Sequence, residues 1–207
     1  MPHLYYITNR QVCPIPLLDN IKRAIEAGVD FIQIREKDLS ARELVSLARS
    51  AREMKRGHET KILVNDRLDV ALAADLDGIH LGQSSVPAQQ IHDKLPKPDF
   101  LLGVSTHSLE EVGAARKHGA NFITFGPVFF TPSKAGYGDP AGLEALKKVC
   151  QFARIPVFAL GGIDEKNYLE CLLNGASGIA AIRLFQDPDI SIQKIAGKIK
   201  QFQNRNE

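Results

Sequence analysis

The stretch Ala27-Gly28-Val29-Asp30-Phe31-Ile32 sets out a plan that recurs three more times along the 207-residue chain. The other copies are Ala74–Ile79 (ADLDGI), His118–Ile123 (HGANFI) and Asn174–Ile179 (NGASGI). In three of the four copies a glycine ends a helical pattern, and an apolar residue, a short polar residue and an apolar run follow. The second positions, 28, 75, 119 and 175, lie 47, 44 and 56 residues apart, and each step has the length of two strand–helix units.

Short apolar runs rich in Ile, Val and Phe, typical of buried parallel strands, alternate with amphipathic stretches from end to end. The expected strands are Leu4–Thr8, Phe31–Arg35, Lys61–Asn65, Gly78–Leu81, Leu101–Ser105, Phe122–Gly126, Pro156–Leu160 and Gly178–Arg183. Ser40 with Glu43, and Ser108 with Glu111, have the spacing of capping boxes that begin helices. Eight strands alternating with eight helices predict the α/β class and a (β/α)8 TIM barrel, with residues 1–207 as a single domain.

Composition excludes several classes of partner. Lys and Arg number 26 against 24 Asp and Glu, and this net charge of +2 is too small to indicate nucleic-acid binding. Three cysteines without a CxxC pair argue against a disulfide scaffold or a structural zinc site and fit a reducing cytosol. No apolar stretch approaches the ~18 residues of a membrane helix. We therefore expect a cytoplasmic protein with no nucleic-acid or membrane partner; a homo-oligomer is compatible with the sequence.

Candidate site residues follow the strands, because the active sites of such barrels lie at the carboxyl ends of the strands. After the second strand, alternation places Gln33, Arg35 and Lys37 on one side, either as an ion-pair cluster or as a site for an anionic substrate. Asn65 and Asp66 follow the third strand, where they form either a turn or part of a Mg²⁺ site. His80 is expected to be a hydrogen-bonded core histidine, and His107 a loop residue.

A second group of residues predicts binding of anions. Thr131, Ser133 and Lys134 lie in the longest loop, residues 126–140, where hydroxyls and a lysine can hold a phosphoryl group. Gly161 and Gly162 follow the seventh strand, ahead of a helix expected to open at Asp164, and Arg183 ends the eighth strand. Two anion sites indicate two phosphorylated small-molecule substrates, or one phosphate and one pyrophosphate.

Six motifs occur in a characteristic order over most of the chain. They are QIREK at 33–37, ND at 65–66, DGIHLGQ at 77–83, GVSTHSLEE at 103–111, FGPVFFTPSK at 125–134 and LGGI at 160–163. This set resembles the thiamin-phosphate synthase family, a group of (β/α)8 barrels that also contains the thiazole tautomerases.

The resemblance implies a transferase of thiamin biosynthesis that uses Mg²⁺. A pyrimidine alcohol diphosphate would lose pyrophosphate, and the ring nitrogen of a thiazole phosphate would capture the resulting cation. By motif, the implied pyrophosphate ligands are Gln33, Arg35, Lys37, Asn65 and Lys134. Asp66 would bind Mg²⁺, Ser105 would contact the pyrimidine, and Thr131, Ser133 and Gly162 would hold the thiazole phosphate. Lys134, Arg35 and Ser105 are the implied catalytic residues.

The sequence departs from the synthase pattern at three positions. Ser85 stands where synthases carry a second aspartate, Arg183 stands where they carry serine, and Ser133 replaces the more usual threonine. The first two changes resemble the tautomerases, isomerases that need no Mg²⁺, but the acid/base histidine of that branch is Pro127 here. The complete pyrophosphate set favours a synthase, with a tautomerase or a non-catalytic binder of thiamin precursors as alternatives.

Overall fold

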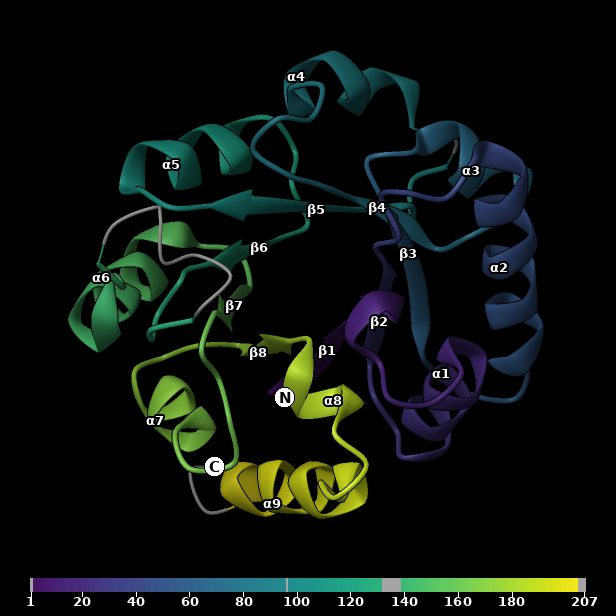
Figure 1. Cartoon of the computed structure of the whole chain (residues 1–207). Coiled ribbons are helices and arrows are strands. Elements are labelled where there is room, and N and C mark those ends of the chain that lie inside the picture. The colour runs from purple at the N-terminus through teal and green to yellow at the C-terminus, as the bar shows by residue number, and fades with distance from the viewer. Residues whose placement is uncertain (1, 96, 132–138, 205–207) are drawn as a thin grey trace.

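The computed structural model describes residues 2–95, 97–131 and 139–204, and in these residues eight parallel strands close into a barrel (Figure 1). The strands are β1 (His3–Ile7), β2 (Phe31–Ile34), β3 (Lys61–Asn65), β4 (Gly78–Leu81), β5 (Leu101–Thr106), β6 (Phe122–Phe125), β7 (Val157–Leu160) and β8 (Gly178–Ala181). Neighbours in the sequence are neighbours in the sheet, and β8 pairs with β1 to close the ring. The predicted (β/α)8 architecture is confirmed. The largest shift of a boundary is at β8, which ends at Ala181 and not at Arg183.

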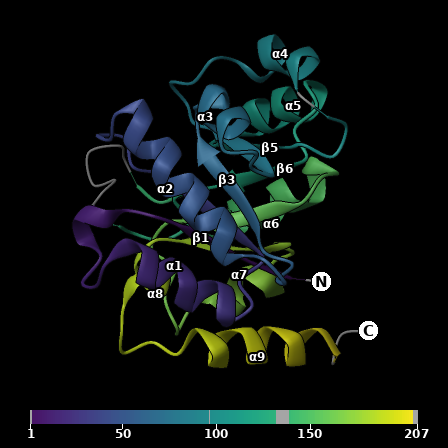
Figure 2. The same ribbon diagram turned by 90° about the vertical axis from the view of Figure 1, so that its right-hand side faces the viewer.

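Helices surround the barrel (Figure 1). They are α1 (Leu17–Glu26), α2 (Ala41–Met54), α3 (Leu68–Ala73), α4 (Ala88–Ile91), α5 (Leu109–Lys117), α6 (Gly142–Ala153), α7 (Tyr168–Leu173), α8 (Arg183–Gln186) and α9 (Ile192–Asn204). The single helix expected after the eighth strand is divided into the short α8 and the longer α9. Figure 2 shows α9 on the outer side of the molecule, and in Figure 1 it lies between α7 and α1. No helix of the described ranges is long and apolar enough to cross a membrane.

The predicted capping residues begin two of these helices. Ser40 and Glu43 form a complete capping box at α2, as the sequence predicted. At α5 the Ser108 side chain accepts a hydrogen bond from the Glu111 backbone, but the Glu111 carboxylate accepts from the backbone of His107 and not from that of Ser108. The second box is therefore not reciprocal, because its acidic side chain reaches one residue further back.

The four-fold repeat ends α1, α3, α5 and α7 in the same way. Its second residue has a left-handed backbone in every copy, with φ of 79° at Gly28, 49° at Asp75, 80° at Gly119 and 93° at Gly175. The next residue then donates a backbone hydrogen bond to a carbonyl five positions earlier, as Val29 does to Ala24 at 3.1 Å. Asp75 adopts the same conformation as the three glycines, so the departure of this copy in sequence leaves the geometry unchanged.

The short polar residue of each copy joins two strands at their amino ends. Asp30 donates its backbone N–H to the Leu4 carbonyl at 3.1 Å, and its carboxylate accepts from the Leu4 N–H at 2.8 Å. The same two bonds link Asp77 to Ile62, Asn121 to Leu102 and Ser177 to Val157. Each odd-numbered strand is thus attached to the turn that precedes its even-numbered neighbour.

Aromatic rings fill the inside of the barrel below the carboxyl ends of the strands. Tyr5, Phe122 and Phe158 are buried there and contact Phe31, with ring centroids 5.3 Å apart for Phe122 and Phe158. A larger apolar cluster lies between the strands and the helices. Polar side chains that end the strands therefore rest on an apolar layer and can meet only at the open carboxyl end.

Candidate active site at the carboxyl ends of the strands

A row of polar side chains crosses the barrel at the end of β2, β3, β4 and β5. Gln33 Nε2 donates to Asn65 Oδ1 at 3.1 Å, and His80 Nε2 lies 3.0 Å from Ser105 Oγ. Tyr5 joins the two pairs, because its hydroxyl lies 3.4 Å from Gln33 Oε1 and 3.1 Å from His80 Nδ1. The structure therefore brings together Gln33, Asn65 and Ser105, three of the residues that the sequence predicted for one site.

His80 lies at the centre of this row as a neutral ring. It is 2% exposed, as expected for a hydrogen-bonded core histidine. Burial lowers its pKa to about 3, and the nearby Arg35 charge acts in the same direction, while Asp66 opposes both. Gly103 on β5 makes room for the ring, since a Cβ there would lie 2.5 Å from His80 Nδ1. His80 is therefore uncharged at neutral pH.

Asp66 directly follows β3 in an uncommon backbone conformation. Its φ is 62°, and its N–H donates to the His80 carbonyl at 3.0 Å. One carboxylate oxygen accepts from Asn65 Nδ2 at 2.6 Å, and the other accepts a hydrogen bond from the Ser85 hydroxyl. Ser85 thus contacts the carboxylate from the loop after β4, the place where the family resemblance implied a second aspartate.

Arg35 and Lys37 follow β2, which ends at Ile34. Arg35 is half-buried, and Lys37 is exposed and lines a hollow of about 260 Å³ together with Asn65 and Asp66. The hollow lies between the ends of β2 and β3, so the cation and the carboxylate share it. Gln33, in contrast, is 1% exposed and lies inside the barrel.

Sequence reasoning missed the support beneath Arg35. Glu36 is 4% exposed, and it accepts a hydrogen bond from Thr8 Oγ1 at 2.5 Å and another from the Arg10 backbone at 3.0 Å. Thr8 Oγ1 in turn accepts from the Arg35 backbone at 2.9 Å. A charged residue between two proposed ligands was the available signal, because alternation separates its side chain from those of Arg35 and Lys37.

The other side of the barrel mouth holds the second predicted anion site. Thr131 is half-buried after β6, whereas Ser133 and Lys134 lie outside the described residues. Gly161 and Gly162 have φ of 97° and 65°, and a Cβ would lie 2.6 Å from Pro127 Cα at Gly161 and 2.4 Å from the Phe130 carbonyl at Gly162. Both glycines are therefore required by the close packing of the loops after β6 and β7.

Two expectations on this side need correction or a different place in the fold. Asp164 does not open a helix: α7 begins at Tyr168, and the Asp164 carboxylate accepts from the backbone of Lys166 and Asn167 in a turn. Arg183 lies beyond β8 as the first residue of α8, and it is exposed.

His107 follows β5 in a loop, as expected, with its Nδ1 against the Gly126 carbonyl.

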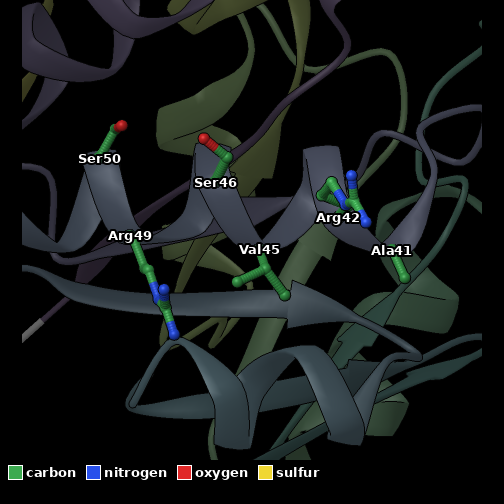
Figure 3. Close-up of a pocket in the computed structure, with 6 residues that line it drawn as sticks. All are labelled: Ala41, Arg42, Val45, Ser46, Arg49 and Ser50. Atoms are coloured by element: carbon green, nitrogen blue, oxygen red, sulfur yellow. The ribbon is translucent and has the colours of Figure 1, made fainter.

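A second hollow, of about 520 Å³, lies on the surface of α2 and contains none of these residues (Figure 3). It is lined by Ala41, Arg42, Val45, Ser46, Arg49 and Ser50, all from that one helix. Arg49 already donates to the Ala73 carbonyl at 2.9 Å. We therefore place the candidate site at the barrel mouth and not on this helix.

Comparison with known proteins gives consistent results. The chain is 47% identical over 188 residues to a protein of Geobacter sulfurreducens named "Putative thiamine-phosphate synthase", covering 90% of this chain and 88% of the relative. It is 41% identical to the thiamine-phosphate synthase of Moorella thermoacetica, over 81% of this chain and 79% of the relative. The fold matches a solved thiamine phosphate pyrophosphorylase from Pyrococcus furiosus with a TM-score of 0.86 and 33% identity, over 96% of each chain.

The family model described as thiamine monophosphate synthase matches residues 4–185, a range that runs from β1 into α8 and includes every predicted site residue. The family resemblance stated from the motifs is thus confirmed, and the relatives' names agree on thiamine-phosphate synthesis, a transferase reaction of thiamine biosynthesis. The chain belongs to the thiamine monophosphate synthase family.

Proposed function

We propose that the residues at the ends of β2 to β5, together with Lys134, bind a pyrimidine alcohol diphosphate. The other predicted site residues after β6 to β8 bind a thiazole phosphate. The two substrates are joined with release of pyrophosphate. The observation that carries the assignment is the hollow at the ends of β2 and β3, which Lys37, Asn65 and Asp66 line together with Glu36 and Arg67. An anion with several oxygens fits such a mixture of cations and amide donors.

The reaction needs charge stabilisation more than proton transfer. As the bond to pyrophosphate breaks, negative charge grows on the leaving group, and Arg35 and Lys37 are the residues proposed to neutralise it. Gln33 and Asn65 complete this set, and Ser105 contacts the pyrimidine. Lys134 acts with the same leaving group, while Thr131, Ser133, Gly161, Gly162 and Arg183 hold the thiazole phosphate.

Asp66 is the proposed protein ligand of Mg²⁺, which would supply further positive charge to the leaving pyrophosphate. Among the described residues no group of three or more His, Cys, Asp or Glu side chains is placed to hold a metal ion. One carboxylate with neighbouring amide and hydroxyl oxygens fits an ion that arrives with its diphosphate, because Mg²⁺ keeps few protein ligands when phosphates complete its shell.

The test is formation of thiamin phosphate from the two substrates, with and without Mg²⁺, by wild type and by Asp66→Asn. Asparagine tolerates a positive φ, so this substitution removes the charge and keeps the backbone. We expect product only with Mg²⁺ and a loss of roughly 100-fold or more in Asp66→Asn, the order of a lost transition-state charge contact. The matched control is Asp69→Asn, on the exposed start of α3, which should keep full activity.

Two results would contradict this assignment. If the wild type forms no thiamin phosphate but isomerises a carboxythiazole phosphate without Mg²⁺, the site serves a tautomerase; if it binds the substrates without turnover, the protein is a binder. A single domain over residues 1–207, cytoplasmic location, a homo-oligomeric state and the lack of nucleic-acid partners stay predictions.

A further inference from the structure

The hydrogen bonds across the barrel form one continuous series from β6 to the loop after β3. Thr124 Oγ1 donates to Ser105 Oγ at 3.4 Å, and the series continues through His80, Tyr5, Gln33 and Asn65 to Asp66. Four of its members, Thr124, His80, Tyr5 and Gln33, are at most 2% exposed. Because each group has few partners, the direction of every bond can be derived from the end of the series.

Asp66 sets that direction, because its two carboxylate oxygens accept from Asn65 Nδ2 and from the Ser85 hydroxyl. Asn65 must present its Nδ2 to Asp66, so its Oδ1 faces Gln33 and accepts from Gln33 Nε2. The Gln33 amide oxygen is then left facing Tyr5, and the Tyr5 hydroxyl must donate to it. With its proton committed to Gln33, Tyr5 Oη can only accept from His80 Nδ1.

The ring of His80 passes this direction on to Ser105. Its two nitrogens contact hydroxyl groups, Tyr5 on one side and Ser105 on the other, and neither contact is a carboxylate. A buried neutral ring with its proton on Nδ1 leaves Nε2 as an acceptor, so the Ser105 hydroxyl must donate to it. Thr124 then donates to Ser105 Oγ from the other side.

We propose that His80, with Tyr5 behind it, is a positioning residue that turns the Ser105 hydroxyl proton into the barrel wall and leaves an oxygen lone pair toward the substrate. Ser105 is half-buried at the mouth, so this lone pair is the group it presents. A substrate atom beside it must be a hydrogen-bond donor. Resting on the proposed function, the inference assigns Ser105 to a hydrogen-bond donor on the pyrimidine ring, such as an amino substituent, and predicts rejection of a pyrimidine with a carbonyl there.

The first test determines the tautomer of His80 in the ligand-free protein by NMR spectroscopy. The ¹⁵N chemical shifts of a histidine ring separate protonated from unprotonated nitrogens, and the His80 signals are assigned by their absence in His80→Gln. We expect a protonated Nδ1 and an unprotonated Nε2 at neutral pH. A proton on Nε2 overturns the proposal, and this readout does not depend on any catalytic activity.

The second test is the ratio of kcat/KM for the amino-pyrimidine diphosphate to that for its oxo analogue. Because both kcat/KM values scale with the fraction of active protein, their ratio does not change when a variant is partly misfolded. Wild type should prefer the amino compound by roughly 10- to 100-fold, the range for one satisfied against one unsatisfied buried group. Tyr5→Phe should lower the ratio about tenfold, because His80 then favours a proton on Nε2 and Ser105 is free to donate to the carbonyl.

Tyr6→Phe is the matched control. It removes a buried hydroxyl from the adjacent residue of β1, one that accepts from Asn20 at 2.9 Å outside this series, and it should leave the ratio unchanged. His80→Gln keeps a hydrogen-bond donor and an acceptor. It should therefore preserve the preference for the amino compound better than His80→Leu does. In a Ser105→Ala background, Tyr5→Phe should have no further effect on the ratio.

Equal loss of both activities in Tyr5→Phe and His80→Leu, with the ratio unchanged, overturns the proposal even where the enzyme is a synthase. If neither pyrimidine diphosphate reacts in wild type, the proposed function fails instead, and the NMR result still decides the orientation of Ser105.

Discussion

The hydroxyl of Ser85 lies against the carboxylate of Asp66 and accepts the Gly82 N–H at 2.5 Å. This small polar residue keeps Asp66 hydrogen-bonded without adding charge. A second carboxylate at this position would repel Asp66 in the absence of a cation and would bind a divalent cation together with it. Ser85 therefore sets how strongly the free protein can attract Mg²⁺.

Ser85→Asp should convert this site into a two-carboxylate Mg²⁺ site. Without Mg²⁺ the thermal midpoint should fall through like-charge repulsion, and Mg²⁺ should restore it, with an affinity roughly tenfold above wild type, or ~1.4 kcal/mol. Synthase activity at limiting Mg²⁺ should rise. Thermal unfolding over a Mg²⁺ titration measures the first effect. Ser84→Asp, at the exposed neighbour, is the control, and equal behaviour of the two variants would contradict the prediction.

Single residues of the site were predictable where one strand alone determines them. The sequence predicted Gln33, Asn65 and Ser105 at one end of the barrel, and the structure brings them together there, while their roles stay predictions. Tyr5 and Glu36 were not predicted, because their partners come from other strands: Tyr5 reaches Gln33 across 28 residues, and Thr8 reaches Glu36 across the same separation. Those contacts depend on the register of β1 against β2, which a pattern within one strand does not contain.

At the scale of elements, the repeat around Asp30 was recognised, but the role of its polar residue was not. The helix-ending glycine is visible as a residue type, and its left-handed backbone follows from that type. The hydrogen bond of the polar side chain to a strand 15 or more residues away is visible only in the folded ring. The four copies show that one local sequence plan builds four equivalent strand–turn attachments.

Asn121→Ala should destabilise the barrel by about 1–3 kcal/mol, because the buried Leu102 N–H loses its acceptor at 2.7 Å. Asn121→Asp, which keeps an acceptor oxygen as the Asp30 and Asp77 copies do, should retain most of the stability. Urea unfolding at constant m-value is the measurement. Ser177→Ala should have a smaller effect, since its bond to Val157 is longer, at 3.3 Å. Equal losses in Asn121→Ala and Asn121→Asp would argue against the attachment.

At the scale of the whole molecule, closure of the ring divides the barrel mouth into two sides. In a ring of eight strands β3 and β7 are four strands apart and hence opposite, so Asn65 and Asp66 face the glycines after β7 across the mouth. If each side binds one substrate, a substitution on one side should weaken the binding of that substrate and leave the binding of the other unchanged.

Arg183→Ser tests this separation. Arg183 is exposed at the start of α8, whereas the following residues Leu184–Gln186 are buried, so the substitution should leave packing intact. If the guanidinium holds the thiazole phosphate, its loss should raise the KM for that substrate by about tenfold, the lower end for a charge-assisted hydrogen bond. The KM for the pyrimidine diphosphate should stay unchanged. Arg35→Gln should give the reverse pattern, because Arg35 lies on the β2 side. A lower KM for thiazole phosphate in Arg183→Ser would mean that the bulk of the arginine excludes that substrate. A parallel change in both KM values, in either variant, would contradict the division of the mouth into two sides.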